Sequence, residues 1–283
     1  SITLDMQCKY GKGIFWYCPL EYIYIGRNIQ YIQDSYTSLN CGPSAFYNKG
    51  TLTEVVLGDS VTNIPDYLFS NCKNLESITI SKNLESIGTS AFSECSNLKK
   101  VNYDGSISSW MNINFSNKFS TPFSYGGHWY NNDTEVTGLV IPDSITYIGK
   151  YVFYGFEGIE SVSFSKNVIT IDDNAFGNCD GLKKVDYRGL LSDWLDIEFV
   201  SYTSNPLSQA GHLYINGNEI KKLIIPENVT SIGNFSFYGC KDLTSVTIPN
   251  SVVSIGNYAF YGCSSLTSVT IPDGVTSIVI FAF

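Results

Sequence analysis

The sequence is poor in histidine and in charged residues. Its 283 residues include two histidines, and Asp, Glu, Lys and Arg together make up 15% of the chain, with a net charge of −9. This acidic balance argues against nucleic acid as a partner, because phosphate binding needs a basic surface. Two histidines are also a small inventory for acid–base catalysis.

Long apolar runs and the common catalytic motifs are missing as well. No run approaches the length of a membrane-crossing helix, so we expect a chain that does not insert into a membrane. The sequence has no HExxH, no G-x-x-x-x-G-K-S/T phosphate loop and no recognisable nucleophile elbow. We therefore expect no enzymatic activity, no cofactor and no metal.

What the sequence has instead is a repeat. The phrase LTSVTI that opens at Leu243 returns almost unchanged at Leu266. We call the first residue of each such phrase the opener of its repeat. Most openers follow the previous opener by the same number of residues as Leu266 follows Leu243, and three longer intervals end at Leu52, Val136 and Ile220. The span from Leu52 to Val136 is repeated from Val136 to Ile220, which gives a second, longer period. The ten openers are Leu20, Leu52, Leu75, Leu98, Val136, Ile159, Leu182, Ile220, Leu243 and Leu266.

Each repeat predicts one strand and one coil of a stack. In LTSVTI, apolar and small polar residues alternate, which is typical of a strand, and a proline that follows in several repeats ends it. Counted from the opener, a phenylalanine such as Phe260 holds the same position in nine repeats, and an isoleucine such as Ile255 precedes it in most. Trp110 and Trp194 replace that isoleucine in two of the long repeats. Since one repeat cannot bury its own apolar side, stacked repeats are expected to share a core built from these columns.

The expected fold is an α/β-type repeat solenoid, mostly β with short turns or 3-10 segments. We expect one ten-strand parallel sheet on its concave face and, from the crossover rule, a right-handed coil. We expect residues 20–283 to form this solenoid. Residues 1–19 match nothing in the repeat and are expected to form an N-terminal cap.

The two long repeats that contain these tryptophans predict inserts. Their extra residues should follow Phe115 and Phe199, within 116–135 and 200–219. Each insert is expected to flank a rim of the concave face and to end in a hairpin. The expected turns are Asn131-Asn132 and Asn216-Gly217.

The consensus LxSVTIPxSVxSIGxYAFxGCxSL resembles the 23-residue leucine-rich repeat of the BspA type, which is typical of bacterial surface and secreted proteins. The resemblance covers nearly the whole chain from Leu20 onward. Long repeats such as VDYRGLLSDWLDIEFVSYTSNPLSQAGHLYINGNEIKKLIIP resemble inserted units of such proteins. The resemblance to this family implies a leucine-rich-repeat superhelix that is secreted or held at the cell surface. It also implies a protein that carries no catalytic residues and binds other macromolecules, often in adhesion.

We therefore expect an exported, non-enzymatic interaction module that binds a protein or a glycan, in adhesion at a cell surface. The alternatives are a structural spacer and, less favoured, a carbohydrate-active enzyme. Such an enzyme needs two opposed acids. The concave positions offer Glu54 and Asp186, without a neighbouring acidic pair.

Candidate binding residues lie in the inserts and on the concave face. The inserts hold aromatic and histidine side chains that suit an anchoring role, although folding back over the inserts' own backbone is the alternative for most of them. The candidates on the insert rims are Tyr125, His128, Trp129, Tyr130, Tyr202, His212 and Tyr214. The candidates on the concave face are Lys100, Lys184 and Lys222.

Five of the eight cysteines occupy one repeat position: Cys72, Cys95, Cys179, Cys240 and Cys263. Phe156 fills that position in another repeat, so these thiols are expected to be buried and to behave as small apolar side chains. Cys8 and Cys18 lie outside the column. A disulfide between them is one hypothesis, with Cys41 as the rival partner.

The last repeat reads SIVIFAF where the preceding repeat reads SIGNYAF. Its apolar residues would expose core at an open end of the solenoid. We expect either a longer chain or a partner at this end, such as a second copy associating end to end through the C-terminal repeat.

Overall fold

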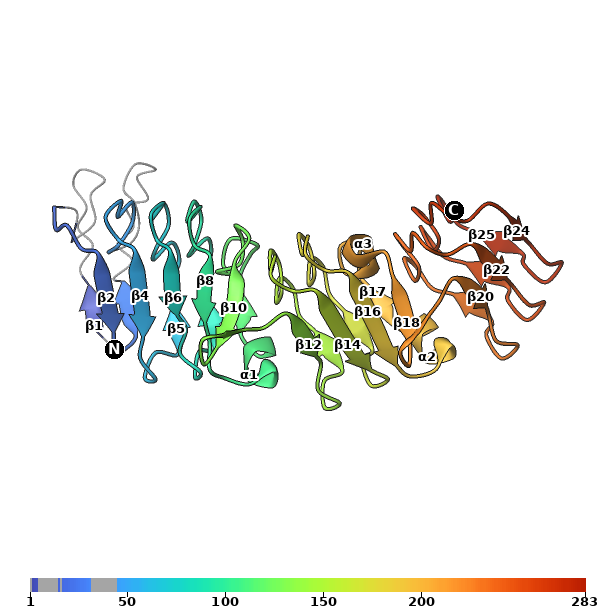
Figure 1. Ribbon diagram of the computed structural model, residues 1–283, viewed down its shortest axis with the longest axis horizontal. Helices are drawn as coiled ribbons and strands as arrows, with labels where there is room; N and C mark the ends of the chain where they lie inside the picture. Colours follow the sequence, from blue (N-terminus) through green and yellow to red (C-terminus); the bar gives the residue numbers. More distant parts are fainter. Residues whose placement is uncertain (1, 5–14, 16, 32–44) are drawn as a thin grey trace. The chain divides into compact units, whose positions relative to one another are not determined.

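The structure is a computed structural model that describes residues 2–4, 15, 17–31 and 45–283. These residues run as short strands joined by turns, with helices of four or five residues between them (Figure 1). None of the helices in these ranges is long and apolar enough to cross a membrane.

The chain divides into two compact units. Unit 1 contains Ser1–Val136 and Tyr151–Gly158, and unit 2 contains Thr137–Lys150 and Ile159–Phe283. Each has its own stack of coils.

Unit 1 is built on a six-stranded sheet in the order β11-β10-β8-β6-β4-β2. The strands are β2 (Tyr22–Ile25), β4 (Glu54–Leu57), β6 (Ser77–Thr79), β8 (Lys100–Asn102), β10 (His128–Asn131) and β11 (Thr134–Glu135). All neighbours are parallel except β11, which is antiparallel to β10. The return halves of the coils pair as β5 (Asn63–Ile64), β7 (Ser86–Ile87) and β9 (Asn114–Phe115). Near the N-terminus, β1 (Ile2–Leu4) is parallel to β3 (Ile29–Tyr31).

Unit 2 repeats the plan with two outer sheets. The first contains β12 (Gly138–Val140), β14 (Ser161–Ser165), β16 (Lys184–Arg188), β18 (Leu213–Ile215) and β19 (Asn218–Glu219). The second contains β20 (Lys222–Ile224), β22 (Ser245–Thr247) and β24 (Val269–Thr270). The return halves form β13 (Tyr147–Ile148), β15 (Thr170–Ile171) and β17 (Glu198–Phe199), and then β21 (Ser231–Ile232), β23 (Ser254–Ile255) and β25 (Ser277–Ile278).

This arrangement confirms a repeat fold made mostly of parallel strands and corrects two details of the prediction. The strands divide among three outer sheets and do not form one ten-strand sheet. The antiparallel strands β11 and β19 each end a ladder, because they take the edge that the next parallel strand would need. The return halves, expected as turns or 3-10 segments, contain a second parallel ladder of two-residue strands, and the described residues include no 3-10 helix.

The long repeats also divide differently from the prediction. Phe115 pairs with Ile87, and Phe199 pairs with Ile171, so both lie in the isoleucine column and not in the phenylalanine column. The reason is that the helices α1 (Ile107–Met111) and α2 (Leu191–Leu195) precede them and lengthen the coil. His128 consequently pairs with Lys100, and the remaining extra residues form the hairpin.

The aromatic core follows the repeat. The rings of Phe46, Phe69 and Phe92 stack with centroids 5.9 and 5.6 Å apart, and those of Phe237, Phe260 and Phe283 with centroids 5.2 and 5.3 Å apart. Trp110 and Trp194 are fully buried, as predicted. Their indole N–H groups donate to the carbonyls of Val152 at 2.8 Å and Ser236 at 2.9 Å.

The cysteine column is buried, as predicted. Three of its thiols donate to the carbonyl of a phenylalanine in the preceding coil: Cys72 to Phe46, Cys95 to Phe69 and Cys263 to Phe237. Burial raises the pKa of Cys72, Cys240 and Cys263 to about 12, so these thiols stay protonated and unreactive. Cys18 is an exposed free thiol, and its candidate disulfide partners Cys8 and Cys41 lie outside the described residues.

Most of the predicted cap, residues 1–19, also lies outside the described residues. Lys49 contacts its last part. Lys49 is only 4% exposed, and its ammonium donates to the carbonyl of Cys18 at 2.8 Å and to that of Phe15. Burial lowers the pKa of Lys49. This buried lysine therefore ties the chain before the first opener to the first coil.

Candidate functional site

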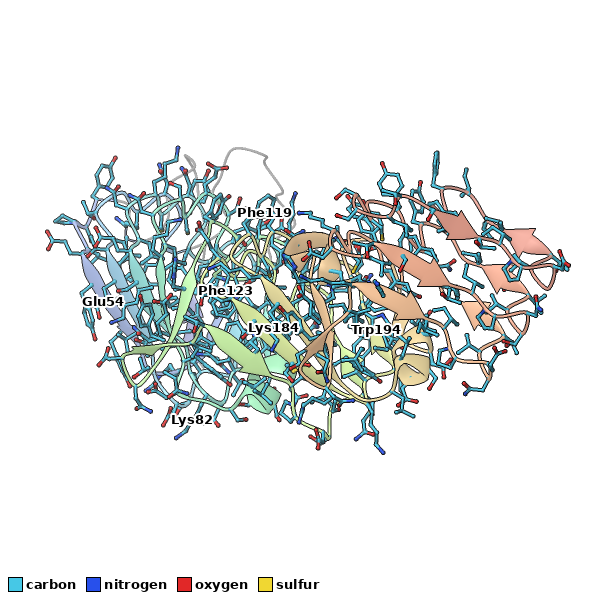
Figure 2. All side chains as sticks on the ribbon, turned by 45° about the vertical axis from the view of Figure 1, so that its right-hand side comes forward. Glu54, Lys82, Phe119, Phe123, Lys184 and Trp194 are labelled. Carbon is cyan, nitrogen blue, oxygen red and sulfur yellow. The ribbon has the colours of Figure 1, made fainter. Side chains whose placement is uncertain are left out.

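The outward face of the unit 1 sheet has aromatic residues at its first strand. Burial alternates along β2, so Tyr22 and Tyr24 point outward and are 53% and 61% exposed. Glu54 of β4 pairs with Tyr22 and also projects outward (Figure 2). Exposed aromatic side chains are the usual anchors of a protein interface.

A lysine and a tyrosine pair at the other end of this sheet. Lys100 of β8 places its ammonium 5.2 Å from the ring centroid of Tyr130 in β10, within cation–π range. The same ammonium lies 3.1 Å from the carboxylate of Asp133 in the hairpin turn. Two of the predicted binding residues are therefore brought together on one surface.

Unit 2 carries the equivalent pair. The ammonium of Lys184 in β16 lies 4.5 Å from the ring centroid of Tyr214 in β18, and 3.4 Å from a carboxylate oxygen of Asp186 (Figure 2 labels Lys184). The other oxygen of Asp186 accepts the backbone N–H of Gly217 at 3.0 Å. Asp186 thus stabilises the hairpin turn, which argues against a catalytic role. Lys222, the third predicted lysine, is exposed on β20.

The two hairpins position the tyrosines. Asn216 and Gly217 have φ of 50° and 78°, so the predicted turn is confirmed. In unit 1, Asn131 still pairs with Thr134, and the turn residues are Asn132 and Asp133, one position later than predicted.

Each predicted histidine contacts carboxylates. His128 Nδ1 lies 2.5 Å from Glu135 Oε1. His212 Nδ1 lies 2.8 Å from Asp242 Oδ2 and 3.5 Å from Glu219 Oε1. Both imidazoles are half-buried beside a hairpin and are oriented by these acids.

The remaining predicted rim residues have different roles. Trp129 is 1% exposed and donates its indole N–H to the carbonyl of Tyr103 at 3.1 Å, so it is a core residue and not a rim contact. Strand alternation explains this correction, because Trp129 pairs with the buried Val101. Tyr125 accepts the backbone N–H of Glu94 at 2.7 Å and covers the neighbouring coil. Tyr202 is exposed.

Sequence reasoning missed some of these residues. Tyr22 and Tyr24 lie two and four positions after the opener Leu20, which is the register of the outward face and would have identified them. Glu135 and Glu219 are offset along the sequence by the same amount as the two histidines, which is a second usable signal. Asp242 had no such signal, because its counterpart in unit 1 is Gly158.

Unit 2 has a further aromatic surface on its turns. Tyr238 stacks on Tyr261 with centroids 5.5 Å apart, and Phe235 stacks on Tyr258 at 5.6 Å. Phe235 and Tyr258 have φ of 59° and 53°, a conformation that is uncommon for bulky side chains. Their backbone N–H groups donate to carbonyls of the next coil, which stabilises this conformation.

Comparison with solved structures finds bacterial repeat proteins. A leucine-rich repeat protein from Bacteroides ovatus is 24% identical, with 91% of this chain and 70% of that chain covered and a TM-score of 0.45. One from Eubacterium ventriosum is 15% identical, with 91% and 88% covered and a TM-score of 0.39. A leucine rich cell surface protein from Faecalibacterium prausnitzii is 18% identical, with 88% and 87% covered and a TM-score of 0.31. No curated protein matches the chain.

The repeat itself matches a described family. Six copies of the BspA type leucine rich repeat region match residues 39–122, 125–204 and 211–283. These ranges take in every strand from β4 to β25. The chain therefore belongs to the family of BspA-type leucine-rich repeat proteins.

Proposed function

We propose that the chain is an exported, non-enzymatic interaction module that binds a protein partner through the outward faces of its parallel sheets, in adhesion at a cell surface. Membership of the family supports an exported location, because this repeat is typical of bacterial surface and secreted proteins. A glycan is the alternative ligand.

The observation that carries the proposal is the pairing of lysine and tyrosine at the hairpin edge of a sheet in each unit. Lys100 with Tyr130, and Lys184 with Tyr214, present an aromatic ring beside a positive charge. Tyrosine buries a large area at little entropic cost, and it is enriched where binding energy concentrates. In unit 1, the exposed Tyr22 and Tyr24 add anchors to the same face.

Point substitutions test this better than removal of a whole insert. Deleting residues 116–135 would also remove the buried Phe123 and Trp129 and the strand β10, so lost binding would report damage to the fold. Substitutions of outward side chains leave the coil stack intact.

The experiment measures binding of the purified chain to a panel of extracellular proteins and glycans. For each ligand found, we expect Tyr130→Ala, and a Tyr22→Ala/Tyr24→Ala double variant, to weaken binding about tenfold or more, as hot-spot anchors do. Tyr261→Ala, an exposed tyrosine on the turns of unit 2, is the matched control and should bind within about twofold of the unmodified chain.

Three results would overturn the proposal. Binding only to glycans would favour the alternative ligand, and binding to nothing would favour a structural spacer. Protein binding that survives the three sheet-face substitutions would place the contact on another surface.

End-to-end self-association also stays a prediction. Val279, Ile280 and Phe281 in the last coil are exposed apolar residues that a second copy would cover. Sedimentation at several concentrations measures this association. Ile280→Asp should abolish it, because burying a carboxylate in the interface is costly unless a positive charge pairs with it.

A further inference from the structure

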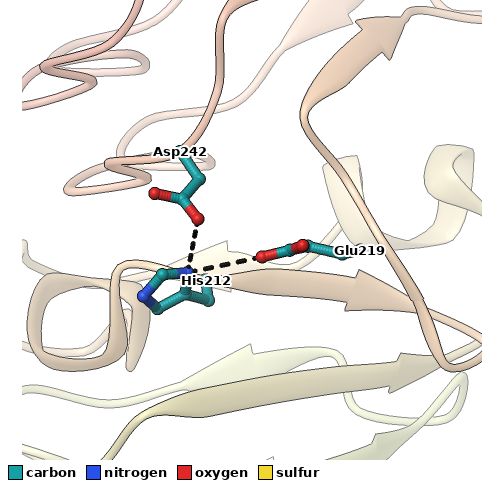
Figure 3. A group of neighbouring side chains, drawn as sticks. All are labelled: His212, Glu219 and Asp242. Carbon is teal, nitrogen blue, oxygen red and sulfur yellow. Dashed lines mark ion pairs between the residues drawn. The ribbon is translucent and has the colours of Figure 1, made fainter.

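Three side chains of unit 2 that are separated in sequence meet beside the β18–β19 hairpin. His212 precedes β18, Glu219 ends β19, and Asp242 lies in the turn that leads to β22 (Figure 3). One ligand atom from each residue lies within 4.8 Å of the other two. Their side chains are 38%, 26% and 35% exposed, so the cluster is partly shielded and still reachable by a small ion.

The donor atoms are those of a cation site. One imidazole nitrogen and two carboxylate oxygens suit Zn²⁺, which binds such ligands at about 2.0–2.2 Å and places them about 3.3 Å apart in a tetrahedron. The observed separations of His212 Nδ1 from the two oxygens, 2.8 and 3.5 Å, lie on either side of this value. Both carboxylates face Nδ1 of His212, so this nitrogen would be the imidazole ligand of a cation bound by the two acids (Figure 3).

The charge around the cluster also favours a cation. Lys221 Nζ lies 3.1 Å from Glu219 Oε2, which leaves Oε1 of the same carboxylate directed at His212. With the imidazole neutral, the two carboxylates and this one ammonium leave a net negative charge. This net negative charge attracts a cation to the cluster.

Unit 1 contains a natural comparison at the equivalent hairpin. His128 and Glu135 form the same pair, but Gly158 stands where Asp242 stands in unit 2. A Cβ atom at Gly158 would lie only 2.8 Å from His128 Nδ1 and 2.9 Å from Glu135 Oε1. The hairpin of unit 1 therefore keeps the histidine–glutamate pair but has no room for a third ligand side chain at Gly158.

We propose that His212, Glu219 and Asp242 bind a divalent cation of the zinc class, with water completing the coordination. This departs from the expectation that the chain binds no metal. The cation would join β19, the edge of the five-stranded sheet, to the turn before β22, which belongs to the separate three-stranded sheet. Its role is therefore to hold these elements of unit 2 together, independently of any partner.

The test uses the full chain without an affinity tag, freed of metal with a chelator and titrated with ZnCl₂ by calorimetry and by thermal unfolding. We expect one Zn²⁺ to bind and the midpoint of unfolding to rise with the Zn²⁺ concentration, because a ligand that binds the folded state stabilises it. Asp242→Asn, which preserves shape, and His212→Ala should each weaken Zn²⁺ binding at least tenfold.

His128→Ala is the matched control, and it should leave the affinity for Zn²⁺ within about twofold. Cysteine is the competing ligand in this chain, so Co²⁺ serves as a second probe. Its spectrum should lack a thiolate charge-transfer band. The proposal is overturned if the unmodified chain takes up no Zn²⁺, if Asp242→Asn binds as tightly as the unmodified chain, or if Co²⁺ shows thiolate ligation.

Discussion

At the scale of single residues, large side chains bury their rings and still satisfy their polar atoms. Trp110 and Trp194 occupy equivalent positions, and each donates its indole N–H to a backbone carbonyl that lies 42 residues later in the sequence, Val152 and Ser236 respectively. The carbonyl of Ser236 also accepts the amide of Asn205 at 3.1 Å. No second donor to the carbonyl of Val152 exists among the described residues.

This difference predicts unequal costs for the same substitution. Both Trp110→Phe and Trp194→Phe lose ring volume, but Trp110→Phe also leaves the Val152 carbonyl buried and unpaired. We expect Trp110→Phe to lower the free energy of unfolding by about 1 kcal/mol more than Trp194→Phe. Denaturant unfolding of both variants measures it.

The control removes the second donor. In the double variant Trp194→Phe/Asn205→Ala, the Ser236 carbonyl loses both donors. After subtraction of the effect of Asn205→Ala alone, the loss in free energy of unfolding should equal that of Trp110→Phe. Equal costs of the two single tryptophan variants would contradict this account.

At the scale of elements, hydrogen bonds between polar side chains connect the turns of one coil to the next. Asp173, in the turn after β15, accepts hydrogen bonds from Ser201 at 2.6 Å, Asn174 at 2.8 Å and Thr203 at 3.0 Å. Burial alone would raise the pKa of Asp173, but these hydrogen bonds outweigh it and hold the pKa below its usual value. The carboxylate form is therefore the stabilising one.

The pH dependence of stability follows from this direction. A depressed pKa in the folded state gives stability that is present above the unfolded pKa of about 4 and is lost as the pH falls through the folded pKa. Between about pH 5 and pH 3, the unmodified chain should lose more stability than Asp173→Asn. Denaturant unfolding at both pH values measures it.

Asp180→Asn changes an exposed aspartate of the same unit and is the control. Its loss of stability over this pH range should match that of the unmodified chain. A parallel pH profile for Asp173→Asn would show that the turn cluster does not depend on the charge.

At the scale of the whole molecule, the chain consists of two compact units in which each coil contacts its neighbours. Repeat proteins of this kind gain stability from each coil and from the contacts between adjacent coils. A local defect should therefore act mainly on its own unit. Phe69 in unit 1 and Phe237 in unit 2 are both fully buried in equivalent columns, which makes them a matched pair.

We expect Phe69→Leu to speed hydrogen exchange in β4, β6 and β8 more than in β20 and β22, and Phe237→Leu to do the reverse. Each substitution should cost about 1–2 kcal/mol, which is enough to speed exchange about fivefold or more in the affected coils. Mass spectrometry of exchanged peptides measures it. Equal acceleration everywhere in both variants would indicate one cooperative unit and contradict the prediction.

The sequence alone determined the repeat and the columns of phenylalanine, isoleucine and cysteine in the regular repeats, because equivalent residues of stacked coils must lie above one another. It also predicted the burial of Trp110 and Trp194, although Phe115 and Phe199 take the place in the isoleucine column that these tryptophans were expected to fill. It could not assign Phe115, since counting from the opener does not show whether extra residues come before or after it, and only the pairing of β9 with β7 decides this. The division into three sheets depended on hairpin strands taking a sheet edge. The meeting of His212 with Asp242, which lie in different repeats, depended on which turns the folded coils bring together.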